Sequence, residues 1–123
     1  MTQAAAQATQ FFEEVAERKA VWMLYGPKGF PTFRTPEGHA IPVWSLQSRA
    51  EAICAKVPSY RAYQPTAVSW DEFHDRWLPD LTREGLRLGV NWSGPKAVGY
   101  DFDAATIRER VEAAILRLTT TDA

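Results

Sequence analysis

The clearest pattern of hydrophobic and polar positions runs from Val68 to Gly85. Bulky apolar side chains recur there at helical spacing and charged side chains fall opposite them, so the stretch predicts an amphipathic helix. Ser69 and Glu72 have the spacing of a capping box, which places the start of the helix at Ser69. Pro79 predicts a kink or a restart, because its nitrogen donates no hydrogen bond, and Gly85 predicts a left-handed stop.

Three other segments have the same periodicity. Residues 3–18 predict an N-terminal helix, and Asp103 predicts the cap of a C-terminal one. Ser48 and Glu51 have the spacing of a second capping box, so a third helix should begin at Ser48 and end before Pro58.

The strands are predicted from runs and alternations of apolar residues. Residues 20–25 form a continuous apolar run, which is typical of a strand covered on both faces. Residues 30–34 and 40–44 follow after turns and complete a three-strand antiparallel meander. Residues 86–102 alternate about a central turn, as in a C-terminal hairpin. Residues 59–67 are predicted to be mainly loop, and the sequence leaves open a short strand at residues 66–68.

Together these segments predict the order α-βββ-α-α-ββ-α. We therefore expect one α+β domain spanning residues 1–123, with an antiparallel sheet and about four helices on one of its faces. Residues 1–3 and 119–123 are expected to be frayed. Trp22 and Trp77 lie in the strongest apolar runs and are expected to be buried.

Composition narrows the class of protein. The chain carries 14 basic and 15 acidic residues, for a net charge of −1, and this balance argues against nucleic-acid and membrane-surface partners. Cys54 is the only cysteine, which excludes an internal disulfide and is typical of a reducing compartment. The N-terminus lacks the basic and apolar regions of a signal peptide, and no apolar run approaches the ~20 residues of a membrane span. We expect a soluble, cytoplasmic protein.

Several motifs are similar to those of one known family. They are Val21-Trp22 with Leu24, the run Ile41-Pro42-Val43-Trp44-Ser45, the run Phe73 to Leu81 closing at Gly85, and the single positions Tyr63, Pro65 and Val90. On these residues the chain resembles the small bacterial proteins grouped as domain of unknown function 2750, over about residues 10 to 115. Because such proteins have no established activity, the resemblance implies a fold and assigns no catalytic residue.

Residues suited to catalysis or metal binding are few. Asp71, His74 and Asp75 lie close together on one helix, and if they were drawn into a cleft they could hold a metal or serve an enzyme. Their pattern matches no metal-binding motif, so a solvated acidic face is the preferred interpretation, and we expect no metal and no cofactor. Cys54 lies on an apolar stripe, which predicts a buried and unreactive thiol.

Four aromatic residues remain at the ends of strands or in loops, and they are Trp44, Tyr60, Tyr63 and Trp92. Aromatic side chains in such places anchor a protein interface, line a ligand cleft or close the ends of a small core, and the sequence leaves these possibilities open. In a cleft, Arg61 would be the polar group.

Gly89 and Gly99 fall on the outward face of the predicted hairpin. Without side chains there, that face would be flat enough to dock a partner or a second copy. The glycines would equally allow another element of the same chain to cover them.

The preferred hypothesis is a non-enzymatic protein-binding or regulatory module, whose partner is another protein or a second copy. The alternative is a small-molecule-binding domain with an aromatic cleft, and the third hypothesis is an enzyme that uses Asp71, His74 and Asp75. The candidate binding residues are Trp44, Tyr60, Arg61, Tyr63, Gly89 and Trp92.

Overall fold

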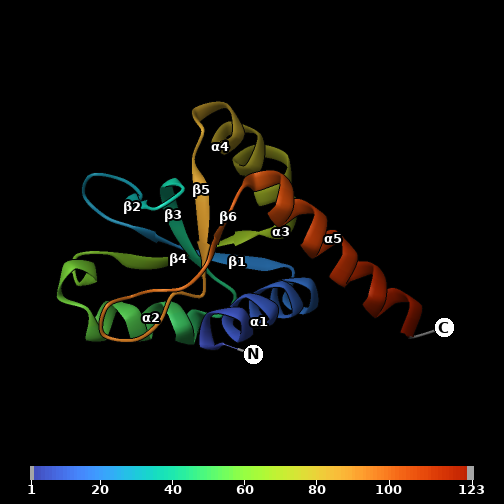
Figure 1. The fold of residues 1–123 in the computed structure, drawn as a ribbon, viewed down its shortest axis with the longest axis horizontal. Helices are drawn as coiled ribbons and strands as arrows, with labels where there is room; N and C mark the ends of the chain where they lie inside the picture. The colour runs from blue at the N-terminus through green and yellow to red at the C-terminus, as the bar shows by residue number, and fades with distance from the viewer. Residues whose placement is uncertain (1, 122–123) are drawn as a thin grey trace.

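The computed structural model describes residues 2–121, which form four helices around one open sheet of six strands (Figure 1). The elements are α1 (Gln3–Arg18), β1 (Ala20–Tyr25), β2 (Phe33–Thr35), β3 (Gly38–Trp44), α2 (Gln47–Lys56), the 3-10 turn η1 (Pro58–Tyr60), β4 (Gln64–Ser69), α3 (Trp70–Glu72), the π-helical turn η2 (Phe73–Trp77), α4 (Leu78–Glu84), β5 (Arg87–Val90), β6 (Asp101–Phe102) and α5 (Ala104–Thr121). Because α3, η2 and α4 follow one another without a break, they form one continuous helix, here called the central helix.

Part of each terminal segment that was expected to be frayed is helical. Gln3 begins α1, and α5 continues through Thr121. Met1, Asp122 and Ala123 lie outside the described residues.

The α+β class and the four helices agree with the sequence, but the predicted sheet is wrong. Strand β5 pairs with β3 in parallel, so the sheet is mixed rather than antiparallel. The strand order is β4-β1-β3-β5-β6 with β2 paired to β3 alone, so the first three strands form no meander. Strand β4, predicted to be mainly loop, pairs with β1 along its whole length. The observed element order is therefore α-βββ-α-β-α-ββ-α.

Pro42 helps to explain why the meander does not form. The hydrogen bond from Asn91 N–H to the Val43 carbonyl, at 3.0 Å, shows that Val43 faces β5. Successive residues of a strand turn their backbone groups to opposite sides, so Pro42 faces the other neighbours of β3. On that side β3 changes partner, from β2 at Ala40 to β1 at Val43, and the Pro42 nitrogen falls between the two.

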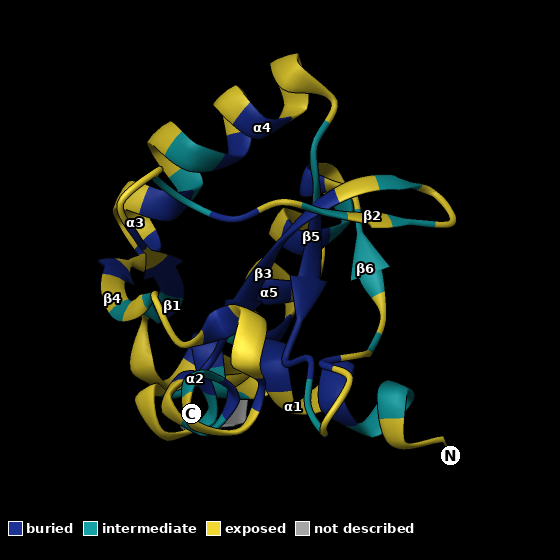
Figure 2. Cartoon of the chain, turned by 90° about the vertical axis from the view of Figure 1, so that its left-hand side faces the viewer, coloured by how far each residue is buried: buried dark blue, intermediate teal, exposed yellow. Residues whose placement is uncertain are grey.

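Alternation along the strands separates two hydrophobic clusters on the two faces of the sheet. Val21 and Met23 of β1 pack with α1, the central helix and α5. Trp22 and Leu24 point to the other face, where they pack with α2 and η1. Helix α2 therefore lies opposite the other three helices, and the expectation that all helices share one face is wrong. Figure 2 shows that β3 and β5 are largely buried.

The central helix begins at Ser69 as predicted. The Ser69 hydroxyl oxygen accepts a hydrogen bond from Glu72 N–H at 3.2 Å. The helix widens into the π-helical turn η2 just before Pro79, which has no N–H for a regular helical bond. It ends at Gly85, whose backbone is left-handed with φ 70°.

Two expectations about individual side chains are wrong. Helix α2 starts from Leu46 as its N-cap, because the chain leaves β3 extended at that residue, and no side chain caps the helix. Ser48 therefore lies inside the first turn and forms no capping box with Glu51. Trp22 and Trp77 are half-buried rather than buried, because both lie at the rims of their clusters.

Trp92 folds back over Gly89 and Gly99. A Cβ atom at Gly89 would lie 2.2 Å from the Trp92 ring, and one at Gly99 would lie 2.7 Å from it. Both distances are too short for a real contact, so the indole can lie flat there only because both positions are glycine. The two glycines are thus covered from within the chain, and Gly89 presents no flat outer face.

Two serines provide a matched test of helix capping. Ser69→Ala should lower the free energy of unfolding by about 1 kcal/mol, because the Glu72 N–H loses its acceptor. Ser48→Ala should change it by less than about 0.5 kcal/mol, because Ser48 caps no helix. Urea denaturation of both variants beside the wild type measures the two values, and equal losses would contradict the observed cap.

The contact between Gly89 and Trp92 predicts a coupled effect on stability. Gly89→Ala should cost about 1–3 kcal/mol, because the added methyl group overlaps the indole. In a Trp92→Leu background the same change should cost much less, because the smaller side chain leaves room. A double-mutant cycle from urea denaturation measures this coupling. Additive costs would show that the indole does not restrict position 89.

Candidate functional site

A hollow of about 390 Å³ opens between β2, η1 and the segment from Trp92 to Asp101. We call it the aromatic cleft. Its lining includes Phe33, Thr35, Tyr60, Trp92, Lys96 and Asp101. Its volume lies within the range of small-molecule sites, and both polar and apolar groups line it.

Three aromatic rings form the apolar wall of the cleft. Phe33 stacks on Tyr60 with 5.1 Å between ring centroids and 7° between ring planes, and Trp92 meets Phe33 edge to face at 6.3 Å. Tyr60 and Trp92 are buried and Phe33 is half-buried, so Phe33 is the ring most open to a ligand. Burial, followed by the nearby Tyr63 and Cys54, raises the pKa of Tyr60 to about 12, so it stays a neutral phenol near pH 7.

Asp101 supplies the most firmly held polar group of the cleft. Its Oδ2 accepts hydrogen bonds from Arg87 Nε at 2.7 Å and from Thr35 Oγ1 at 3.1 Å, and Arg87 Nη2 donates to the Asp101 carbonyl at 3.0 Å. The Asp101 side chain is 9% exposed. Both of these side-chain bonds go to Oδ2, and within residues 2–121 no fully buried side-chain oxygen lacks a partner. Oδ1 therefore keeps some exposure to solvent, and Asp101 is one of the residues that line the cleft.

Two hydrogen bonds fix the position of Trp92. Its indole Nε1–H donates to the Tyr100 carbonyl at 3.0 Å, and its own carbonyl accepts from the Trp44 indole at 2.9 Å. The preceding residue, Asn91, has a left-handed backbone with φ 50°, which asparagine tolerates better than most residues. This conformation turns the chain out of β5, so that Trp92 can fold back over Gly89.

A buried polar network holds Asn91 in turn. Asn91 Oδ1 accepts from Ser45 N–H at 3.0 Å, and its Nδ2 donates to the Gln7 carbonyl at 3.3 Å. Ser45 Oγ donates to Glu14 Oε1 at 2.6 Å, and Arg49 donates to both oxygens of that carboxylate, at 3.0 and 3.1 Å. The network joins α1, α2 and β3 to the end of β5. Helices α1 and α2, which it connects, follow one another along the bottom of Figure 1 and meet at the Arg49–Glu14 ion pair.

A second, mainly apolar hollow of about 480 Å³ lies against α1 and the segment from Ser93 to Tyr100. Lys96, Val98 and Gly99 line both this hollow and the aromatic cleft. These residues are therefore a thin partition between two adjoining hollows.

The structure brings together two of the six candidate binding residues. Tyr60 and Trp92 both line the aromatic cleft. Trp44 is fully buried against Tyr60, with 6.5 Å between ring centroids, so it closes the core instead. Gly89 lies beneath Trp92 and accommodates its ring.

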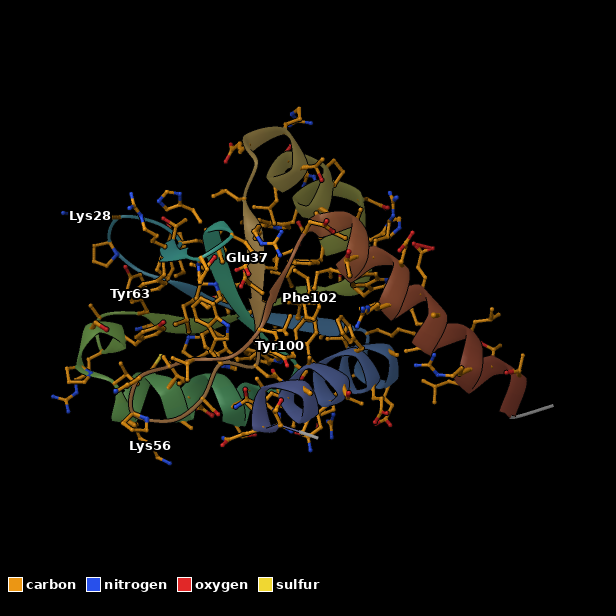
Figure 3. The ribbon with its side chains drawn as sticks, in the orientation of Figure 1. Lys28, Glu37, Lys56, Tyr63, Tyr100 and Phe102 are labelled. Atoms are coloured by element: carbon orange, nitrogen blue, oxygen red, sulfur yellow. The ribbon has the colours of Figure 1, made fainter. Side chains whose placement is uncertain are left out.

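The other two candidates are not among the residues that line the cleft. A Cβ atom at Gly26 would lie 2.7 Å from the Tyr63 ring, and Figure 3 shows Tyr63 on the side of the Lys28 turn, away from Tyr100. Arg61 is exposed in the loop before β4. The charged and polar groups of the cleft come instead from β2, from η1, and from β6 with the segment before it.

Sequence reasoning missed Phe33, Thr35 and Asp101. They come from strands far apart in the chain, and no local pattern shows that β2 and β6 would line the same hollow. One signal was present, because Arg87 and Asp101 are opposite charges on two strands that were predicted to pair. Such cross-strand charge pairs stabilise a sheet and locate its register.

The acidic residues of the central helix lie on another surface. His74 Nδ1 is 2.8 Å from Asp75 Oδ1, and His74 Nε2 is 3.5 Å from Glu112 Oε1 of α5. Asp71 is exposed, and the Asp75 side chain is 71% exposed. Among residues 2–121, no group of three or more His, Cys, Asp or Glu side chains could hold a metal ion.

Cys54 is half-buried rather than buried as predicted. Burial first, and then the Glu51 carboxylate, raise the pKa of its thiol. The sulfur is therefore mainly protonated at neutral pH, which makes it a poor nucleophile.

These features define a small α+β domain with a mixed sheet and a cleft at the end of its C-terminal hairpin. The chain belongs to the family described as Protein of unknown function (DUF2750), whose sequence model matches residues 8–111. This match confirms the family indicated by the motifs. A search of the curated proteins gave no match. None of the helices described here is long and apolar enough to cross a membrane.

Glu14 gives the polar network a dependence on pH. Burial opposes its ionisation, but hydrogen bonds from Arg49 and Ser45 outweigh burial and lower the pKa of Glu14. A carboxylate with a lowered folded-state pKa stabilises the fold above its unfolded-state pKa. That contribution is lost as the pH falls through the folded-state value.

We therefore expect the wild type to be more stable than Glu14→Gln at neutral pH, and the difference to shrink between about pH 5 and pH 3. Urea denaturation at several pH values measures this difference. Glu13→Gln, on the exposed side of α1, is the matched control. A difference for Glu14→Gln that stays constant with pH would refute the role of this carboxylate.

Proposed function

We propose that this domain binds a small molecule in the aromatic cleft. The observation that supports this most directly is Asp101, a lining residue whose Oδ2 is held by Arg87 and Thr35 while Oδ1 keeps some exposure to solvent. A carboxylate fixed in one position with an available oxygen is suited to accept a hydrogen bond from a ligand. Beside it, the partly open Phe33 ring offers an apolar contact surface, and this combination is typical of ligand sites.

The lining groups favour one class of ligand. Phe33 and Trp92 favour a planar ring. Asp101 Oδ1 calls for an N–H or O–H donor on that ring, because an ionised carboxylate only accepts. Lys96 and Arg34 are exposed residues of the lining and favour an anionic group. The proposed ligand is therefore a planar aromatic compound with one donor and one anionic substituent.

A protein-binding or regulatory module is the second candidate function. Val98 is 60% exposed and Tyr100 is 44% exposed, and both line the second hollow beside the cleft. Exposed apolar and aromatic side chains at a concave surface are typical anchors of a protein partner. Asp71, His74 and Asp75, on which the enzyme hypothesis depends, lie on the central helix and are not among the residues that line the cleft. A cytoplasmic location stays a prediction from the cysteine content.

Three small compounds test the proposed ligand chemistry. Para-aminobenzoate carries a donor and an anion, benzoate carries the anion alone, and aniline carries the donor alone. Each is titrated into the protein while the NMR signal of the Trp92 indole N–H is followed. We expect para-aminobenzoate to shift this signal at the lowest concentration. No shift with any compound would rule out a site for this class of ligand.

A pair of lysine variants separates the cleft from general charge effects. Lys96→Gln should weaken the binding of para-aminobenzoate by about two- to fivefold, because an exposed charge pair contributes little more than that. Lys28→Gln removes the same charge from a turn that does not line the cleft and should leave binding unchanged. Equal weakening in both variants would mean that the anionic group does not bind at the cleft.

A further inference from the structure

Strand β4 is the end of the sheet, and its outer edge is free of any other strand of the described chain. The hydrogen bond from Trp70 N–H to the Lys19 carbonyl, at 2.8 Å, shows which residues of β4 turn their backbone groups toward β1. In an antiparallel pair, residues alternately face the partner strand and face away from it. Val68 and Thr66 therefore face β1, opposite Val21 and Met23.

The alternate residues of β4 turn their backbone groups outward. They are Pro65, Ala67 and Ser69. Ala67 offers an N–H and a carbonyl. Ser69 offers its N–H, because its carbonyl, as that of the N-cap residue, already accepts the first bond of the central helix, and Pro65 offers only a carbonyl. Ala67 and Ser69 are exposed, and β4 contains no charged residue, although charges are a common protection of a free edge.

We propose that β4 pairs with the β4 strand of a second copy of this chain, antiparallel about a two-fold axis at Ala67. Ala67 then lies opposite Ala67 of the partner subunit, and the two exchange a pair of hydrogen bonds. Ser69 N–H donates to the carbonyl of Pro65 of the partner subunit, and the symmetric bond forms in return. The two sheets become one continuous sheet.

The pattern of donors along the edge favours a second copy over an unrelated segment. In this register the ladder lacks only the hydrogen bond that an N–H at position 65 would donate. Because the dimer is two-fold symmetric, this bond is absent once in each copy. Every outward N–H of β4 therefore finds an acceptor within β4 of the other copy. The strands carry no charge, so pairing brings no like charges together. Self-complementary contacts of this kind produce closed two-fold dimers.

Pro65→Ala tests the proposal by a gain in affinity. The variant supplies an N–H that can share the carbonyl of Ser69 of the partner subunit with the helix, so the dimer should become about three- to tenfold tighter. Ala67→Pro removes an outward donor and should weaken the dimer by about tenfold or more. Thr66→Ala is the control, because the backbone of Thr66 faces β1. Sedimentation equilibrium over a range of protein concentrations measures all four proteins.

Hydrogen exchange of the wild type makes the test independent of the variants. The Ala67 and Ser69 amides should exchange more slowly as the protein concentration rises. A chain that stays monomeric in both the wild type and Pro65→Ala would overturn the proposal. A dimer in which these two amides remain unprotected would also overturn it, because its interface would lie elsewhere.

Discussion

The C-terminal half of the sheet depends on the contact of the Trp92 indole with Gly89 and Gly99. The ladder between β5 and β6 contains only two residue pairs, Leu88 with Phe102 and Gly89 with Asp101. Such a short ladder has few hydrogen bonds to hold the returning chain. A buried indole removes about 150–250 Å² from water, and that of Trp92 also bonds the Tyr100 carbonyl. The indole thus takes the place of a longer ladder, and in doing so it becomes a wall of the cleft.

The buried polar groups behind Trp92 make this arrangement specific. Burial of Ser45 and Asn91 would be costly if their hydrogen bonds were not made, and here each is satisfied. Their partners Gln7 and Glu14 come from α1, and Arg49 of α2 holds the Glu14 carboxylate in turn. Both helices therefore help to fix the turn at Asn91. The hydrophobic clusters supply most of the stability, and the polar network selects one geometry for the end of β5.

Local sequence signals were sufficient to predict the features that depend only on residues close together in the chain. The bounds of α1, the cap at Ser69 and the stop at Gly85 all follow from neighbouring residues. The same logic failed at Ser48, because the path of the chain out of β3 starts that helix at Leu46.

Features that depend on distant segments could not be predicted. The sequences of β3 and β5 do not indicate that the two strands pair in parallel, since apolar strands are compatible with both parallel and antiparallel pairing. The cleft was recognised only through Tyr60 and Trp92, which stand out as aromatic residues near strand ends. Phe33 and Asp101 belong to short strands, and their shared location arises only when the sheet has formed.

The parallel pairing also has a consequence for the order of folding. In the chain, α2, β4 and the central helix all lie between β3 and β5. Bringing the two strands together closes a long loop. The chain loses conformational entropy on this closure before the new contacts can compensate for the loss. The pairing of β1 with β4 spans a similar length of chain, so two long-range strand pairings flank the same central pair, β1 and β3. Until both have formed, the nascent sheet exposes unpaired edges, and this period is when the chain is most open to aggregation.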